Sequence, residues 1–199
     1  MSIPSTVKAQ KAALRQTVLH ARSLLSPLEV KSGSESITKR FVETQNFRES
    51  KAVSCFLSMS GEVDTDGIVR EVLRTGKTLY VPRMNGRVID MLRVYDLRDL
   101  DALPSGKWGI QEPEPVKDGE PRQDGVAFDD KLARLGYGRG YYDRFVNTYA
   151  EKFGAARTPK LFGVALDAQI VGTGEIPLES HDRILDAVIT PTDDYGRIQ

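Results

Sequence analysis

Short apolar runs alternate with helical segments along this chain, and this alternation restricts the possible folds more than any other feature. Residues 52–57 form an almost entirely apolar run, as in a strand that is covered on both faces. Residues 65–75 have a helical pattern that ends at Gly76, a typical C-terminal cap. Further strand-like runs lie at residues 78–81, 88–95, 161–166 and 184–189. The pattern predicts an α/β fold in which helices pack on a mixed β-sheet.

Two helices are predicted at the N-terminus, over about residues 5–47. Apolar residues recur at helical spacing up to about residue 25, which predicts an amphipathic helix. Ser26-Pro27 then interrupts the pattern and is typical of the start of a second helix, which we expect to reach about Phe47.

The domain organisation follows from length and from one irregular segment. Residues 104–125 contain four prolines and four glycines, so we expect a linker without regular structure there. A length of 199 residues suits one domain, and residues 1–199 are therefore predicted to form a single domain. No apolar run approaches the roughly 20 residues that a membrane span needs.

Charge and cysteine content exclude several classes of protein. Lys plus Arg and Asp plus Glu each total 28, so no global field attracts nucleic acid or a membrane surface. The single cysteine, Cys55, lies in an apolar run, which argues against a disulfide framework or a zinc site and indicates a reducing compartment. Nothing indicates an obligate protein partner.

The first predicted helix is basic, and two interpretations remain open. Residues 1–28 contain no acid, as in an organelle transit peptide. The alternative, which we favour, is the first helix of a cytoplasmic protein, with a mitochondrial location as the minor alternative. Lys8, Lys11, Arg15 and Arg22 fall within about 60° of one another on a helix, beside the apolar face. These cations either extend to solvent without a function or face a cleft, where Lys11 and Arg15 are suitably spaced for a polyphosphate.

A second tempting phosphate motif is rejected. Gly76-Lys77-Thr78 resembles the end of a P-loop, but Glu71 stands where that motif needs a glycine. In addition, a helix precedes the tripeptide and a strand follows it, which is the reverse of the P-loop order. The tripeptide is predicted to be a helix cap that leads into a strand.

A dense glycine cluster precedes a helix expected over residues 141–152. Gly136, Gly138 and Gly140 do not fit the dinucleotide-binding fingerprint, but they allow the backbone to approach a bulky anion closely at a helix N-terminus. The cluster therefore suits a nucleotide-binding loop.

Charged residues flank this cluster. Arg134 and Arg139 supply cationic forks that suit phosphate or carboxylate. Asp143 suits an anion site only if a metal lies between it and the phosphates, and magnesium binds one or two carboxylates in this way. The alternative is a flexible glycine loop, with Asp143 simply favourable at a helix N-terminus.

Asp186 is a second carboxylate of interest. It is the only polar residue in the run 184–189, which we expect to be buried. An unpaired buried carboxylate costs several kcal/mol, so this one needs a metal, a cation or hydrogen-bond donors. The alternative is a position at a strand end, in contact with water.

With these residues described, the chain resembles the 5-formyltetrahydrofolate cyclo-ligase family, also called 5,10-methenyltetrahydrofolate synthetases, from about Lys8 to Thr190. The strongest match is residues 135–143, Leu-Gly-Tyr-Gly-Arg-Gly-Tyr-Tyr-Asp, which is close to the family's L-G-x-G-x-G-Y-Y-D. Three further matches lie at residues 56–59 with Glu62, at residues 81–83 and at residues 107–110.

The resemblance implies a set of site residues on a single α/β domain. ATP would be held by Lys11, Arg15, Arg134, Leu135, Gly136, Tyr137, Gly138, Arg139, Gly140, Tyr141 and Tyr142. Arg139 and Tyr142 would be catalytic. The folate would contact Leu57, Glu62, Trp108, Tyr137, Gly138, Arg139, Gly140 and Tyr141. Mg²⁺ would be bound by Asp143 and Asp186.

The implied reaction is ATP-dependent cyclisation of 5-formyltetrahydrofolate, with or without a polyglutamate tail, to 5,10-methenyltetrahydrofolate. It needs alignment and charge neutralisation more than a covalent nucleophile, so neither His20 nor His181 is given a catalytic role. Two other hypotheses stay open. One is a catalytically impaired family member that binds folate or nucleotide, and the other is a sugar-phosphate isomerase or acyl-CoA enzyme on a similar scaffold.

The chain departs from the family pattern at one place. Family members carry a strand of the type L-D-L-I-x-x-P-G immediately before the segment that matches residues 126–129. Here residues 121–125 stand in its place, roughly a dozen residues short, and nothing between Trp108 and Val126 has the character of a strand. We therefore expect one strand of the family fold to be missing.

Overall fold

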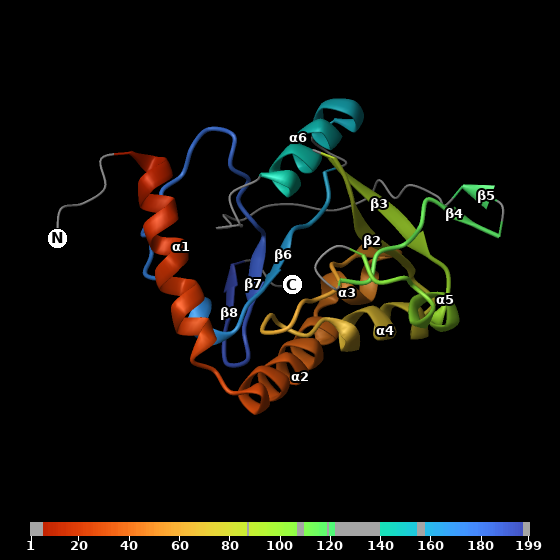
Figure 1. The fold of residues 1–199 in the computed structure, drawn as a ribbon, viewed down its shortest axis with the longest axis horizontal. Helices are drawn as coiled ribbons and strands as arrows, with labels where there is room; N and C mark the ends of the chain where they lie inside the picture. The colour runs from red at the N-terminus through yellow and green to blue at the C-terminus, as the bar shows by residue number, and fades with distance from the viewer. Residues whose placement is uncertain are drawn as a thin grey trace.

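The computed structural model describes residues 6–86, 88–106, 110–118, 120–121, 140–154 and 158–196, and it places helices around small β-sheets (Figure 1). The helices are α1 (Val7–Ser23), α2 (Pro27–Glu43), α3 (Gln45–Glu49), α4 (Asp66–Arg74), α5 (Leu97–Asp101), α6 (Tyr141–Phe153) and the 3-10 turn η3 (Asp167–Gln169). The strands are β1 (Ala52–Ser54), β2 (Thr78–Asn85), β3 (Val88–Val94), β4 (Val116–Lys117), β5 (Glu120–Pro121), β6 (Phe162–Val164), β7 (Ala187–Ile189) and β8 (Asp194–Gly196).

Local capping explains where the N-terminal helices begin and end. The Ser26 hydroxyl accepts from the backbone N–H of Glu29, and the Glu29 carboxylate accepts from the N–H of Ser26, so a capping box starts α2. The expected single helix to Phe47 is wrong in one respect. Thr44 adopts an extended conformation, and its hydroxyl accepts from the N–H of Phe47 at 3.1 Å, which ends α2 and begins α3.

The strands form two separate mixed sheets, and here the expectation of one sheet is corrected. β1 pairs in parallel with β2, and β2 pairs antiparallel with β3. β6 pairs in parallel with β7, and β7 pairs antiparallel with β8. Among the described strands, β1 and β6 are therefore each the edge of a three-stranded sheet. The mixed α/β class is confirmed.

One hydrophobic core joins the two sheets. Ile68, Val69 and Val72 form the buried face of α4 and belong to the same cluster as Leu79 of β2. The cluster also contains Ile189 of β7, so both sheets share a single core. Figure 1 shows α4 beneath the β2 and β3 strands, with α1 on the other side of the β6 to β8 sheet.

The turn after α4 has the predicted form. Gly76 has a φ of +73°, a conformation that favours glycine after a helix. The Lys77 ammonium group donates to the carbonyl oxygens of Arg48 at 3.0 Å and Ser50 at 2.7 Å. The tripeptide at 76–78 joins α4 to β2 in this way, so its rejection as a P-loop is confirmed.

Some short elements differ from the sequence expectation. The segment 104–125 contains the two-residue strands β4 and β5, paired antiparallel, so the prediction of no regular structure is wrong there. The helix α5 and the strand β8 were also not predicted. The described part of the chain contains no helix long and apolar enough to cross a membrane.

Candidate functional site

A cavity of about 1200 Å³ lies between the edge strands β1 and β6. Residues 51–56 form one wall and residues 161–165 form another, and residues 169–174 and side chains of α1, α3 and α6 also line the cavity. Binding pockets for small molecules typically measure roughly 300–1,000 Å³ and are largely apolar with a few polar groups. The cavity is therefore the candidate site, and its polar groups decide what it can bind.

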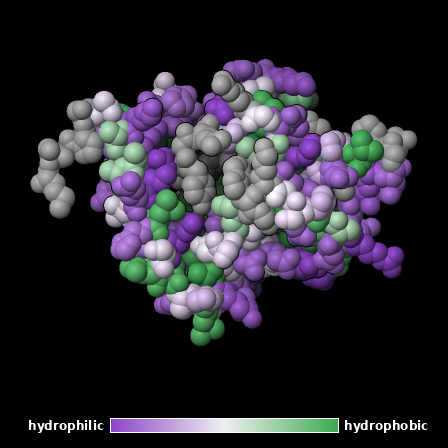
Figure 2. Space-filling view, viewed as in Figure 1, coloured by the Kyte–Doolittle hydropathy of each residue, from purple (hydrophilic) through white to green (hydrophobic). Residues whose placement is uncertain are grey.

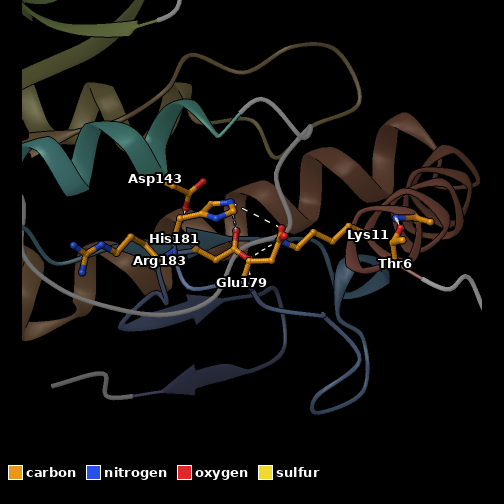
Figure 3. Close-up of polar contacts among 8 residues, drawn as sticks. Thr6, Lys11, Asp143, Glu179, His181 and Arg183 are labelled. Carbon is orange, nitrogen blue, oxygen red and sulfur yellow. Dashed lines mark hydrogen bonds and ion pairs between the residues drawn. The ribbon is translucent and has the colours of Figure 1, made fainter.

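The helix α1 brings two cations to the site. Arg15 lines the cavity, as do the apolar side chains Val18 and Leu19 of the same helix. Lys11, one turn earlier, forms ion pairs with Glu179 at 3.3 Å and with Asp182 (Figure 3). Burial lowers the pKa of Lys11, but the two carboxylates outweigh this effect, and the pKa is raised overall. Of the four cations in the basic stripe, Arg15 and Arg22 line the cavity, whereas Lys8 and Lys11 do not.

The start of α6 forms the opposite side of the site. Gly140 is the N-cap and has a φ of 61° and a ψ of 27°, a left-handed conformation that explains the last glycine of the cluster. Tyr142 lines the cavity, whereas the Tyr141 hydroxyl donates to the carbonyl oxygen of Gly86 at 3.3 Å. The remaining predicted residues Trp108, Arg134, Leu135, Gly136, Tyr137, Gly138 and Arg139 lie outside the described residues.

The two predicted metal-binding carboxylates are tied to the same segment of chain. The Asp143 carboxylate accepts from the N–H of Arg183 at 3.3 Å (Figure 3). Asp186 follows three residues later, and its carboxylate accepts from the N–H of Leu161 at 3.0 Å. These bonds connect the first turn of α6, the segment before β7 and the start of the β6 region.

The predicted burial of the run 184–189 is wrong. Ile184 is 46% exposed, and Asp186 is half-buried directly before β7. Only alternate residues, Leu185, Ala187 and Ile189, are buried, because the segment approaches the sheet with one face toward solvent. Asp186 therefore occupies a strand end, which was the alternative reading.

Asp143 and Asp186 have the donor chemistry that magnesium takes when it binds together with phosphate. Asp143 and Asp186 supply hard oxygen ligands, and each also accepts at least one backbone N–H. Within the ranges that the structure describes, no group of three or more His, Cys, Asp or Glu side chains is arranged to hold a metal ion. Magnesium bound together with phosphate usually takes one or two carboxylate oxygens besides phosphate and water oxygens.

Two predicted folate contacts, Leu57 and Glu62, follow β1, and they lie in different surroundings. Glu62 lines the cavity, and its carboxylate accepts from the N–H of Met59 at 3.1 Å. Leu57 instead packs against the hydrophobic core. Cys55 also lines the cavity, and burial raises the pKa of its thiol to about 12, so it is a poor nucleophile near neutral pH.

Sequence reasoning missed the segment 179–183. Its Glu179 and Asp182 bind Lys11, and the Arg183 guanidinium donates to the Asn147 side chain on α6. The segment thus joins the helix that carries Lys11 to the helix that carries Asp143. No local periodicity or motif marks these residues, because their partners lie far away in the sequence.

These features define an α/β protein with a large cavity that Arg15 and Tyr142 line, and with Lys11, Asp143 and Asp186 on the elements around it. The model of the 5-formyltetrahydrofolate cyclo-ligase family matches residues 7–191. The chain belongs to this family of ligases.

Relatives and solved structures agree with this assignment. A probable 5-formyltetrahydrofolate cyclo-ligase from Caenorhabditis elegans is 36% identical, and the match covers 93% of this chain and 94% of the relative. The mitochondrial 5-formyltetrahydrofolate cyclo-ligase of Arabidopsis thaliana is 31% identical, and the match covers 92% of this chain and 74% of the relative. The NMR structure of Aquifex aeolicus 5,10-methenyltetrahydrofolate synthetase is 31% identical, with a TM-score of 0.70 and 95% of each chain covered. The isomerase and acyl-CoA hypotheses are therefore set aside.

Proposed function

We propose that this chain catalyses the ATP-dependent conversion of 5-formyltetrahydrofolate to 5,10-methenyltetrahydrofolate, with release of ADP and phosphate. One observation carries the proposal. In a member of this ligase family, a single cavity is bordered by Arg15 on α1 and by Tyr142 on α6, with Lys11, Asp143 and Asp186 on the elements around it. Such a combination of cations and carboxylates suits a metal–polyphosphate.

The chemistry requires activation of a poor leaving group. The formyl group on N5 is an amide, and its oxygen would have to leave as hydroxide. Transfer of the γ-phosphoryl group of ATP to that oxygen forms a new P–O bond, breaks the bond to ADP and creates a phosphate leaving group. N10 then attacks the activated carbon and loses its proton, and the C–O bond breaks to release phosphate. Such a transfer depends mainly on alignment and charge neutralisation.

Each group of residues has a proposed task. Lys11, Arg15 and residues 134–142 hold the ATP, and the cations offset its negative charge. Arg139 and Tyr142 act at the transferred phosphoryl group, and the place of Tyr142 on the cavity wall supports this. The folate contacts are proposed for Leu57, Glu62, Trp108, Tyr137, Gly138, Arg139, Gly140 and Tyr141.

Asp143 and Asp186 are proposed to hold Mg²⁺ together with the phosphates of ATP. When bound, the ion would neutralise charge that develops on the transferred phosphate. The backbone N–H groups of Arg183 and Leu161 fix the two carboxylates in place, which supports a positioning role for both segments. A cytoplasmic location is proposed as well, with the mitochondrion as the alternative, since the Arabidopsis relative carries that location in its name.

A spectrophotometric assay tests the function. Purified protein is mixed with 5-formyltetrahydrofolate, ATP and magnesium, and formation of the methenyl product is followed by its absorbance. We expect product only when both ATP and magnesium are present, with one ADP formed for each product molecule. Binding of folate or nucleotide without turnover would instead identify a catalytically impaired family member.

A further inference from the structure

Lys11, the proposed phosphate ligand, already has two anionic partners. Asp182 is one of them, and its side chain is 14% exposed. The same Asp182 oxygen that contacts Lys11 also accepts from the backbone N–H of Glu179 at 2.8 Å. The N–H of Asp182 in turn donates to the Glu179 carbonyl oxygen at 3.0 Å. Asp182 is therefore fixed by its own turn and holds Lys11 in a defined place.

Glu179 differs from Asp182 in exposure and attachment. Its side chain is 44% exposed, and its carboxylate lies 3.3 Å from the Lys11 ammonium group. The exposed His181 ring lies 3.9 Å from the same carboxylate oxygen. Partly exposed ion pairs of this kind contribute little net free energy, so the Glu179 carboxylate can leave Lys11 easily.

The turn is also anchored from the α6 side. The Asn147 side chain donates to the His181 carbonyl oxygen at 3.3 Å, and the Arg183 N–H donates to Asp143 (Figure 3). These bonds involve the backbone of the segment and leave the Glu179 side chain outside. The Glu179 carboxylate can therefore move away while the turn, Asp182 and Asp143 keep their places.

We propose that Glu179 is an internal competitor for the ATP phosphates. It pairs with Lys11 when no nucleotide is bound and leaves when the phosphates arrive, while Asp182 stays as the positioning residue for Lys11. Two carboxylates beside one ammonium group give an excess of negative charge, which opposes a polyphosphate until one carboxylate has left. The inference rests on the proposed function, because it assumes that Lys11 contacts ATP.

The test is the affinity for MgATP without folate, measured by isothermal titration calorimetry. Glu179→Gln keeps the shape of the side chain and removes its charge. We expect a dissociation constant about two- to fivefold lower than in the wild type, which corresponds to about 0.4–1 kcal/mol. A purely structural contribution of Glu179 would have the opposite sign, because its loss would weaken binding.

Two further variants complete the design. Glu71→Gln removes a comparable carboxylate that pairs with Arg74 and does not line the cavity, and it should leave the affinity unchanged. Asp182→Asn should raise the dissociation constant about three- to tenfold, because Lys11 loses its fixed partner. Thermal melts of each variant show that the protein remains folded.

The outcomes separate the two proposals. Wild-type protein that binds no MgATP would overturn the proposed function and this inference together. Wild-type protein that binds MgATP while Glu179→Gln binds equally or more weakly would overturn the inference alone. A lower dissociation constant in both Glu179→Gln and Asp182→Asn would refute the separate roles of the two carboxylates.

Discussion

Insertion of one strand should join the two sheets of this protein. β1 and β6 are edge strands on either side of the same cavity. The alignment with the Caenorhabditis elegans relative spans 197 residues, but 93% of this 199-residue chain is only about 185 residues. About a dozen aligned positions therefore have no residue from this chain. This agrees with the strand that the family pattern has before residue 126.

The perturbation is insertion of Leu-Asp-Leu-Ile-Val-Val-Pro-Gly between Arg122 and Val126. Full burial of four of the five inserted aliphatic side chains contributes about 6–12 kcal/mol. Ordering six strand residues costs about the same, 6–12 kcal/mol, so these two effects nearly cancel. About six ladder hydrogen bonds to both neighbours add about 3–9 kcal/mol net. Since 1 kcal/mol shifts the melting temperature of a domain this size by about 2–4 °C, we expect a rise of at least about 5 °C.

The assay compares three proteins side by side: the chain itself, the strand insertion and an insertion of equal length made of glycine and serine. Thermal melts report cooperativity and melting temperature, and the methenyl-formation assay reports turnover. We expect the strand insertion alone to sharpen the melt and raise turnover. If the unmodified chain melts as cooperatively and turns over as fast, the strand is dispensable and the reasoning about the cavity between β1 and β6 is wrong.

Three further predictions concern the site. Asp143→Asn and Asp186→Asn should each lower kcat/KM at low magnesium by about tenfold or more and change the melting temperature little. Near-normal turnover of both variants would show that neither residue binds the ion. Lys11→Ala and Arg15→Ala should raise the KM for ATP about tenfold and the KM for the folate much less. Equal effects on the two KM values would mean that Lys11 and Arg15 have no specific role at the nucleotide. Burial raises the pKa of Asp182, but the Lys11 ion pair and the Glu179 N–H outweigh it, so the pKa is lowered overall. The stability that Lys11→Met loses, measured by melts from pH 3 to 8, should therefore be present above about pH 4 and disappear as the pH falls through the lowered pKa.

The elements that local signals encode were predictable from the sequence. The helix α4 has an apolar stripe at helical spacing and a glycine after its end, and both features are visible without any tertiary information. The capping box that starts α2 involves residues only three positions apart. Such elements carry their own start and stop signals, because the relevant hydrogen bonds form within one turn.

Short elements that depend on distant partners were not predictable. The strand β8 is exposed along its whole length and has no alternating pattern, so it exists only because β7 pairs with it. The helix α5 is a single turn capped by Asp96, too short for a periodic signal. The separation of the strands into two sheets likewise depends on which edges meet, and the apolar character of β1 and β6 cannot specify that.

The site shows why residue roles and residue environments need different evidence. The resemblance to the family assigned Lys11 to ATP, and the helical spacing placed it beside the apolar face. Neither could show that Asp182, 171 residues away, holds the same ammonium group, or that Glu179 shares it. The strength with which Lys11 attracts a phosphate depends on how much of its charge these carboxylates already offset. Affinity for the nucleotide is therefore set jointly by α1 and by the segment 179–183, and only the folded chain brings the two together.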